Sequence, residues 1–225
     1  MTIRTLFLGL LMGLLSFNAV AAGAFRIGMS ADYPPLHFKQ DGKFMGVEVD
    51  NAIAVGKILG KRAELVQMPF VELIPALRSG KIDVIMSGMS VTAQRSQQVY
   101  FTDSYLRIGQ MAIMLKDRVG SFAQPWAVYR EGIRVGVEPG TTGATFADRE
   151  LKDAEVKMYE NPPAAFEGLR SKEIDLYIHD APTSWQLASS MENNDLISLY
   201  SPLTEEMLAW AVRKEDEKLA GDLNS

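Results

Sequence analysis

The residues best suited to bind a small charged molecule follow the ends of predicted strands. In the first half of the chain, the segment 87–90 (Ser-Gly-Met-Ser) follows a predicted strand, and Arg95 lies on the short helix that begins after Thr92. In the second half, Thr142 and Asp180 each follow a predicted strand. A guanidinium group can bind a carboxylate through two parallel hydrogen bonds, helped by hydroxyl and backbone N–H groups, and a carboxylate can bind an ammonium group. Together, these residue types predict a site for a zwitterion.

Each of these residues also has a structural interpretation. An arginine on a helix is typical of a solvated surface charge, and both Asp180 and Thr142 could cap the helix that follows. The aromatic residues Tyr33 and Phe70 could belong to a hydrophobic core. Residue type and position by themselves therefore do not choose between a binding site and ordinary structural roles.

The elements that must position these residues are predicted from the hydrophobic pattern. It predicts strands at residues 25–29, 62–66, 82–86, 133–137, 156–159 and 174–178, and a segment crossing between the two halves at 111–115. The clearest helices cover 49–59, with Gly60 as a stop signal, and 71–78. Alternation of strands and helices is typical of an α/β fold, with mostly parallel sheets flanked by helices.

Two short sequences recur in the same order in both halves of the chain. The residues from Leu77 to Val84 resemble those from Leu169 to Leu176, and Arg26–Met29 resembles Arg134–Val137. Either match alone is compatible with chance, but two matches in register indicate two α/β lobes of similar topology. Ligands of open α/β sheets lie beyond the carboxyl ends of the strands. We therefore expect a ligand cleft between the lobes, with residues 23–112 in lobe 1, 113–207 in lobe 2, and 208–225 as a return segment to lobe 1.

The N-terminus and the composition indicate an exported protein. Arg4, the apolar run from Leu6 to Leu15 and the small residues Ala21 and Ala22 match a secretory signal peptide, so residues 1–22 are predicted to be removed by cleavage near residue 21 or 22. A membrane anchor would need about 20 uninterrupted apolar residues, whereas Ser16 breaks this run. The 225 residues include no cysteine and carry a net charge of −5, which argues against disulfides, lipid attachment and nucleic-acid binding. We expect a free, monomeric periplasmic protein without metal or cofactor.

Several motifs occur in an order that is typical of one protein family. They are Tyr33-Pro34-Pro35, Gly46-Val47-Glu48-Val49-Asp50, Gly80-Lys81-Ile82-Asp83, Ser87-Gly88-Met89-Ser90-Val91-Thr92 with Arg95, Gly140-Thr141-Thr142, and Ile174-Asp175 with Asp180. Through them, the chain from Phe25 to about Leu219 resembles the bacterial extracellular solute-binding proteins of the polar amino-acid type, which are the periplasmic components of ABC importers. The resemblance implies a two-lobed periplasmic-binding-protein-like fold (type II) that closes around its ligand. It also implies an ABC permease in the inner membrane as partner, and no enzymatic activity.

The resemblance further implies a set of ligand-binding residues. The set consists of Tyr33, Phe70, Ser87, Gly88, Ser90, Arg95, Thr142 and Asp180. In it, Arg95 would bind the carboxylate of an amino-acid ligand, helped by Ser90 and Thr142, and Asp180 would bind its ammonium group. The two aromatic residues would flank the ligand side chain, and residues 87 and 88 would contact it through hydroxyl or backbone groups. No catalytic residue and no metal ligand is expected.

Departures from the family pattern leave alternatives open. Ser30 stands where relatives that take lysine, arginine or histidine often carry an acidic residue, which argues against a cationic ligand side chain. The family usually continues through further helices, which are expected to be missing here because this sequence stops at Ser225; either the sequence is a fragment, or the first lobe lacks part of its usual cover. Some relatives are dehydratases of prephenate-like acids, but Asp180 has no second acid nearby in the sequence. The two histidines, His37 and His179, are interpreted as structural, because His179 alternates away from Asp180 on its strand. The other alternative is a ligand-sensing module.

Overall fold

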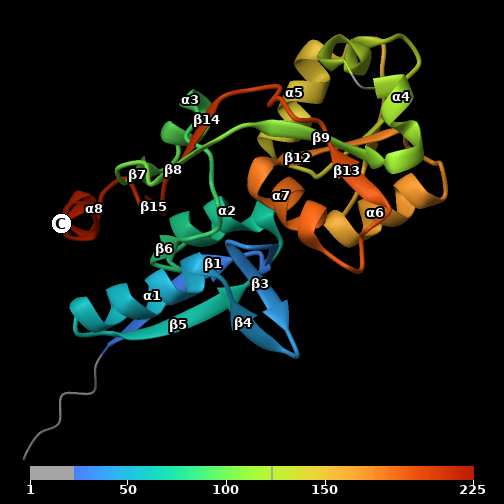
Figure 1. The fold of residues 1–225 in the computed structure, drawn as a ribbon. Helices are drawn as coiled ribbons and strands as arrows, with labels where there is room; N and C mark the ends of the chain where they lie inside the picture. The colour runs from blue at the N-terminus through green and yellow to red at the C-terminus, as the bar shows by residue number, and fades with distance from the viewer. Residues whose placement is uncertain (1–22, 123) are drawn as a thin grey trace, which may run out of the picture.

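Residues 23–122 and 124–225 are described by the computed structural model, so the predicted signal peptide lies outside the described residues. The chain forms two α/β lobes, each built around a five-stranded sheet (Figure 1). The strand order is β5-β1-β6-β15-β7 in the first sheet and β11-β10-β12-β9-β13 in the second. The two-lobed α/β fold predicted from the sequence is confirmed.

The first lobe combines the N-terminal part of the chain with its C-terminal end. Its sheet consists of β1 (Ala24–Met29), β5 (Arg62–Gln67), β6 (Val84–Ile85), β7 (Tyr100–Phe101) and β15 (Ala211–Val212). A small sheet contains β2 (Asp32–Tyr33), β3 (His37–Gln40) and β4 (Lys43–Met45). The helices are α1 (Val47–Ile58), η1 (Phe70–Glu72), α2 (Leu73–Arg78), α3 (Ala93–Ser96) and α8 (Glu217–Asn224). Because β1 pairs in parallel with both β5 and β6, the carboxyl ends of these strands lie at one edge of the sheet.

The second lobe repeats this arrangement. Its sheet consists of β9 (Gln110–Leu115), β10 (Arg134–Val137), β11 (Glu155–Met158), β12 (Leu176–Asp180) and β13 (Leu196–Ser198). Its helices are η2 (Lys116–Arg118), α4 (Val119–Phe122), η3 (Pro125–Tyr129), α5 (Thr142–Glu150), α6 (Pro162–Arg170) and α7 (Ala181–Ser189). Strand β10 pairs in parallel with β11 and β12, as β1 does with β5 and β6, so a second set of carboxyl ends faces the first lobe.

The recurring sequences form the same ion-pair clamp in each lobe. Arg26, on β1, donates to both carboxylate oxygens of Asp83 and to the carbonyl of Gly80. Arg134, on β10, binds Asp175 and the carbonyl of Lys172 in the same way. Each clamp ties the beginning of the first strand to the turn that leads into the third strand. The recurring sequences therefore occupy equivalent structural positions in the two lobes, which explains why both matches occur in the same order in each half of the chain.

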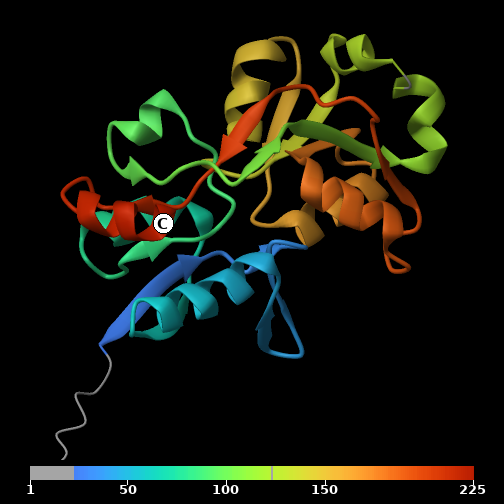
Figure 2. The same cartoon turned by 60° about the vertical axis from the view of Figure 1, so that its left-hand side comes forward.

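Two antiparallel strands, β8 (Leu106–Ile108) and β14 (Glu206–Leu208), connect the lobes (Figure 2). The crossing segment predicted at residues 111–115 is wrong, because these residues belong to β9 and pair with β12 and β13 inside the second sheet. The lobe boundary predicted between residues 112 and 113 thus falls within a strand. A fully buried strand and a buried linker both have a continuous apolar sequence, so hydrophobic periodicity cannot distinguish one from the other.

The C-terminal part of the chain packs in the first lobe. Strand β15 lies between β6 and β7, and Leu219, Ala220 and Leu223 of α8 pack against the core that also contains Phe25 and Ile27. Within the described ranges, the structure contains no helix that is both long and apolar enough to cross a membrane.

Candidate functional site

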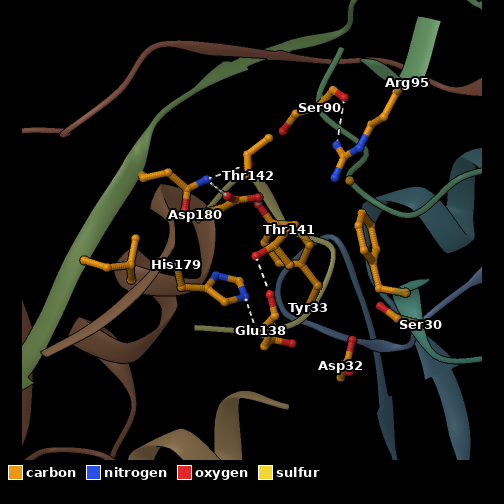
Figure 3. A pocket seen from close by; sticks show the side chains of 14 residues that line it. Ser30, Asp32, Tyr33, Ser90, Arg95, Glu138, Thr141, Thr142, His179 and Asp180 are labelled. Carbon is orange, nitrogen blue, oxygen red and sulfur yellow. Dashed lines mark hydrogen bonds and ion pairs between the residues drawn. The ribbon is translucent and has the colours of Figure 1, made fainter. Parts of the chain in front are cut away.

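A pocket lies where the carboxyl ends of the strands from both lobes meet (Figure 3). The first lobe lines it with Ser30, Asp32, Tyr33, Phe70, Gly88, Ser90 and Arg95. The second lobe lines it with Gln110, Glu138, Thr141, Thr142, Ile178, His179 and Asp180. Seven of the eight predicted site residues are therefore brought to one pocket, although they come from positions up to 147 residues apart.

Arg95 is a buried cation rather than a solvated surface charge. Thr92 caps α3 by accepting a hydrogen bond from the Arg95 backbone N–H, and this fixes the start of the helix that carries the side chain. The guanidinium group donates to the carbonyl oxygens of Ser90 (2.8 Å) and, across the lobes, Gly140 (3.0 Å). It also lies 5.2 Å from the centre of the Phe70 ring. Burial lowers the pKa of Arg95, and among the described residues no carboxylate forms an ion pair with it. Such a group favours an anionic partner.

Asp180 is the anion on the opposite lobe. It stands at the N-cap position of α7, but its side chain makes no capping hydrogen bond. Instead, its carboxylate accepts hydrogen bonds from the Tyr33 hydroxyl (2.5 Å) and from the Gln110 amide. Burial raises the pKa of Asp180, and the charge of Glu206 raises it further. The capping interpretation therefore fails for this residue, whose carboxylate forms no ion pair with a cation among the described residues.

The remaining predicted residues have different positions in the wall of the pocket. The hydroxyl of Thr142 accepts a hydrogen bond from Gln110 (3.1 Å), whereas the helix cap of α5 is the neighbouring Thr141. Gly88 has a φ of 57°, and a Cβ atom there would lie only 2.5 Å from the Tyr33 ring. A glycine is thus required for Tyr33 to lie against the pocket wall.

Ser87 does not line the pocket but supports it from behind. Its hydroxyl accepts a hydrogen bond from the Ser30 backbone N–H (3.0 Å) and lies 3.3 Å from Nε2 of His37. Because Nδ1 of His37 accepts from the backbone N–H of Ala31 (3.2 Å), the proton of the neutral ring lies on Nε2. This histidine cannot take a proton from the serine at Nε2, so the pair is structural. Burial lowers the pKa of His37 to about 3, which keeps the ring neutral.

Sequence reasoning missed an acidic part of the same pocket. His179 was interpreted as pointing away, yet it lines the pocket with Asp180 because β12 ends there and residues from both of its faces border the opening. Its Nε2 atom lies 3.2 Å from Oε1 of Glu138. Burial opposes protonation, but the hydrogen bond and charge of Glu138 outweigh it and raise the pKa of His179. Glu138 directly follows β10, so its position after a predicted strand could have identified it as a candidate site residue.

Asp32 is the second missed acid. It lies on β2, three residues after the end of β1, and it is partly buried. Burial raises its pKa, the Ser30 hydroxyl lowers it, and the negative charge of Glu138 raises it again. Contrary to what the sequence spacing suggested, Asp180 therefore has other acids close to it in space.

Comparison with known proteins places this chain among bacterial binding proteins. The family model of the bacterial extracellular solute-binding proteins, family 3, matches residues 25–225. A probable histidine-binding protein of Campylobacter jejuni is 33% identical over 78% of this chain and 66% of its own length. A cyclohexadienyl dehydratase of Pseudomonas aeruginosa is 28% identical over 71% of this chain and 60% of its own length.

Solved structures agree with the sequence relatives. The Gly52Ala mutant of the arginine-bound arginine-binding protein of T. maritima has a TM-score of 0.82 and 32% identity, covering 90% of this chain and 93% of that chain. The chain spans 66% and 60% of the length of the two curated relatives described above. The match over the described lobes, in sequence and in fold, shows that the chain belongs to the bacterial extracellular solute-binding proteins, family 3.

Proposed function

We propose that this protein holds an amino-acid zwitterion between its two lobes and delivers it to an ABC importer. The observation that carries the proposal is the pairing of charges across the pocket. Arg95 on the first lobe is a buried cation without an ion-pair partner among the described residues, and Asp180 on the second lobe is a partly buried acid. An amino acid supplies one carboxylate and one ammonium group, which are the partners that these two side chains need.

The other pocket residues complete this binding scheme. The ligand carboxylate would lie between Arg95, Ser90 and Thr142, and the ammonium group beside Asp180. Tyr33 and Phe70 would flank the ligand side chain, and the backbone at Gly88 would contact it. Ser87 would act indirectly, through its hydrogen bond to the backbone of Ser30.

Closure of the lobes is part of the proposal. Among the residues that the structure describes, three side-chain hydrogen bonds already join the lobes: Tyr33 to Asp180, Arg95 to the Gly140 carbonyl, and Thr183 to the Pro34 carbonyl (3.2 Å). Two of them use the groups that would hold the ligand. A ligand that binds groups on both lobes therefore also favours the closed form, because it adds further bonds between the lobes. Strands β8 and β14 would act as the hinge for opening.

The family supports a proposal for the cellular setting. We propose that the protein acts as a monomer in the periplasm after removal of the predicted signal peptide, and that it is not an enzyme. Most of the similar proteins are named as binding proteins, including the arginine-binding protein 1 of an ABC transporter in Escherichia coli.

A second candidate function is that of a dehydratase. Two observations favour it: a cyclohexadienyl dehydratase is among the relatives, and the acids Asp32 and Glu138 lie in the same pocket as Asp180. A dehydratase needs a protonated acid to assist departure of a hydroxyl group, and a buried carboxyl group with a raised pKa can serve as one. Incubation with prephenate, followed by ultraviolet detection of an aromatic product, tests this candidate.

The binding function is tested by a thermal-shift screen of the common amino acids on the mature protein. A ligand at about 100 times its dissociation constant stabilises the folded state by about 2.7 kcal/mol, which is easily detected. We expect at least one amino acid to raise the melting temperature, and the same amino acid without its carboxylate (the decarboxylated amine) to have no effect. Absence of a shift with every amino acid, confirmed by calorimetric titration, would refute the proposed function.

A further inference from the structure

We propose that Asp32 and Glu138 form a second, acidic subsite, which binds a cationic group at the distal end of the ligand side chain. The inference rests on the proposed function and names its substrate class: amino acids that carry an additional ammonium or guanidinium group. It reverses the expectation drawn from Ser30, because the carboxylate absent at position 30 is supplied two residues further along the chain and from the opposite lobe.

The first argument is the balance of charge in the pocket. A bound zwitterion would neutralise Arg95 and Asp180, since it supplies one charge of each sign. The carboxylates of Asp32 and Glu138 then remain, with His179 as the only cationic partner among the pocket-lining residues. Two carboxylates and one imidazolium still leave an excess negative charge in a largely buried space. A ligand with one more positive charge balances it.

The second argument is that His179 does not satisfy both acids. The imidazole Nε2 and the Tyr177 hydroxyl both approach the same oxygen of Glu138, Oε1. Among the residues that the structure describes, neither Oε2 of Glu138 nor the carboxylate of Asp32 forms an ion pair with a cation. Burial raises the pKa of Asp32, the Ser30 hydroxyl lowers it, and the charge of Glu138 raises it again, so ionisation of Asp32 beside Glu138 is unfavourable in the absence of a shared cation. A cationic group placed between them would remove this cost.

The third argument is position. Arg95 and Ser90 lie at one end of the pocket, and Asp32 and Glu138 lie at the other (Figure 3). A ligand held by its carboxylate at Arg95 would therefore direct its side chain toward the two acids, past the rings of Tyr33 and Phe70. Ser30, Asp32, Phe70 and Glu138 also line an adjoining groove, whose rim includes a third acid, Glu160. The acidic end is thus the end at which a long side chain would reach the opening of the pocket.

The test compares ligands that differ only in the distal charge. Isothermal titration calorimetry of the mature wild-type protein at neutral pH is carried out with lysine against norleucine, and with arginine against citrulline. We expect the cationic member of at least one pair to bind at least 100-fold more tightly than its neutral partner. Equal affinities within each pair would overturn the subsite, whatever the outcome with the variants below.

Charge-removing variants assign the effect to these residues. Asp32→Asn and Glu138→Gln should each weaken binding of the preferred cationic amino acid at least tenfold and change binding of its neutral partner by less than threefold. Asp41→Asn is the matched control, because it removes the same charge in the exposed turn between β3 and β4 of the first lobe. Equal weakening for charged and neutral ligands would show a general loss of structure and would overturn the assignment. Binding of neutral amino acids alone refutes the subsite but keeps the proposed function, whereas binding of no amino acid refutes both.

Discussion

Replacement of Arg95 by alanine separates a binding role from a structural role for this residue. In the structure the guanidinium group makes two hydrogen bonds to carbonyl oxygens, at 2.8 Å and 3.0 Å. Each hydrogen bond from a charged donor contributes about 1.5–3 kcal/mol, but burial of the charge costs several kcal/mol. These contributions nearly offset each other, so we expect the free energy of unfolding without ligand to change by less than about 2 kcal/mol.

The effect on binding should be much larger. In the complex, the alanine variant would leave the ligand carboxylate in a desolvated pocket without its cation. Removal of one partner of such a buried charge pair costs about 3–5 kcal/mol, which corresponds to a loss of affinity of roughly 150- to 5,000-fold. Loss of binding with nearly unchanged stability is therefore the expected signature of a ligand-binding arginine.

Two measurements on the same samples check this expectation. Isothermal titration calorimetry with the best amino acid from the screen gives the affinity, and urea unfolding followed by circular dichroism gives the stability. Arg62→Ala is the control variant, since Arg62 lies on β5 of the same lobe and its side chain is 67% exposed. The reasoning is refuted if Arg95→Ala binds the amino acid within tenfold of the wild-type protein.

Three further predictions follow from the fold. Gly88→Ala should destabilise the protein by about 1–3 kcal/mol in urea unfolding and weaken ligand binding, because the new Cβ would lie 2.5 Å from the Tyr33 ring at a φ of 57°; unchanged stability would contradict this. Part of the pH dependence of stability should come from His37. Burial lowers the pKa of His37 in the folded state from 6.5 to about 3, so the contribution of His37 to the free energy of unfolding is lost as the pH falls from 6.5 to 3. Burial raises the pKa of Glu48 in the folded state from 4.5 to about 7, so the contribution of Glu48 to the free energy of unfolding is lost as the pH rises from 4.5 to 7. The two slopes oppose each other between pH 4.5 and 6.5. At lower pH the slope of His37 is joined by those of Asp83 and Asp175, because burial opposes their ionisation but the hydrogen bonds of Arg26 and Arg134 outweigh it and lower the pKa of each carboxyl group. His37→Gln should therefore make the acid limb of urea-unfolding free energies shallower without abolishing it, and an unaltered limb would rule this out. Small-angle scattering should show a smaller radius of gyration at saturating ligand, because β8 and β14 are the strands that connect the lobes; an unchanged radius, with binding confirmed separately, would exclude hinge closure.

The order of the elements was predictable because it depends on short segments. Strands and helices were expected close to where β1, α1, β5, β10 and β11 lie, since the apolar residues of each recur with the period of one regular structure. The third strand of each lobe was also expected, although β6 covers only Val84 and Ile85 of the predicted residues 82–86. The recurring Arg and Asp residues indicated two similar lobes, because the same local clamp was needed twice.

The candidate site was predictable where a residue had a distinctive chemistry after a strand. Arg95, Asp180 and Thr142 were singled out in this way, and the structure brings them to one pocket. Their role in binding stays a prediction. Ser87 was placed in the same group, but its side chain faces Ser30 and His37 behind the pocket wall. Proximity to a strand end does not specify on which side of the wall a side chain lies.

The sequence by itself thus determined the two α/β lobes, the family and the positions in the chain where binding groups follow strands. Only the tertiary structure decided that Asp32, Glu138 and His179 border the same pocket as Arg95 and Asp180. Secondary structure and motifs depend on neighbours within a few residues, so local sequence patterns predict them. The charge of a pocket depends on which strand ends two separate lobes place opposite each other, and that juxtaposition arises from packing between residues more than a hundred positions apart.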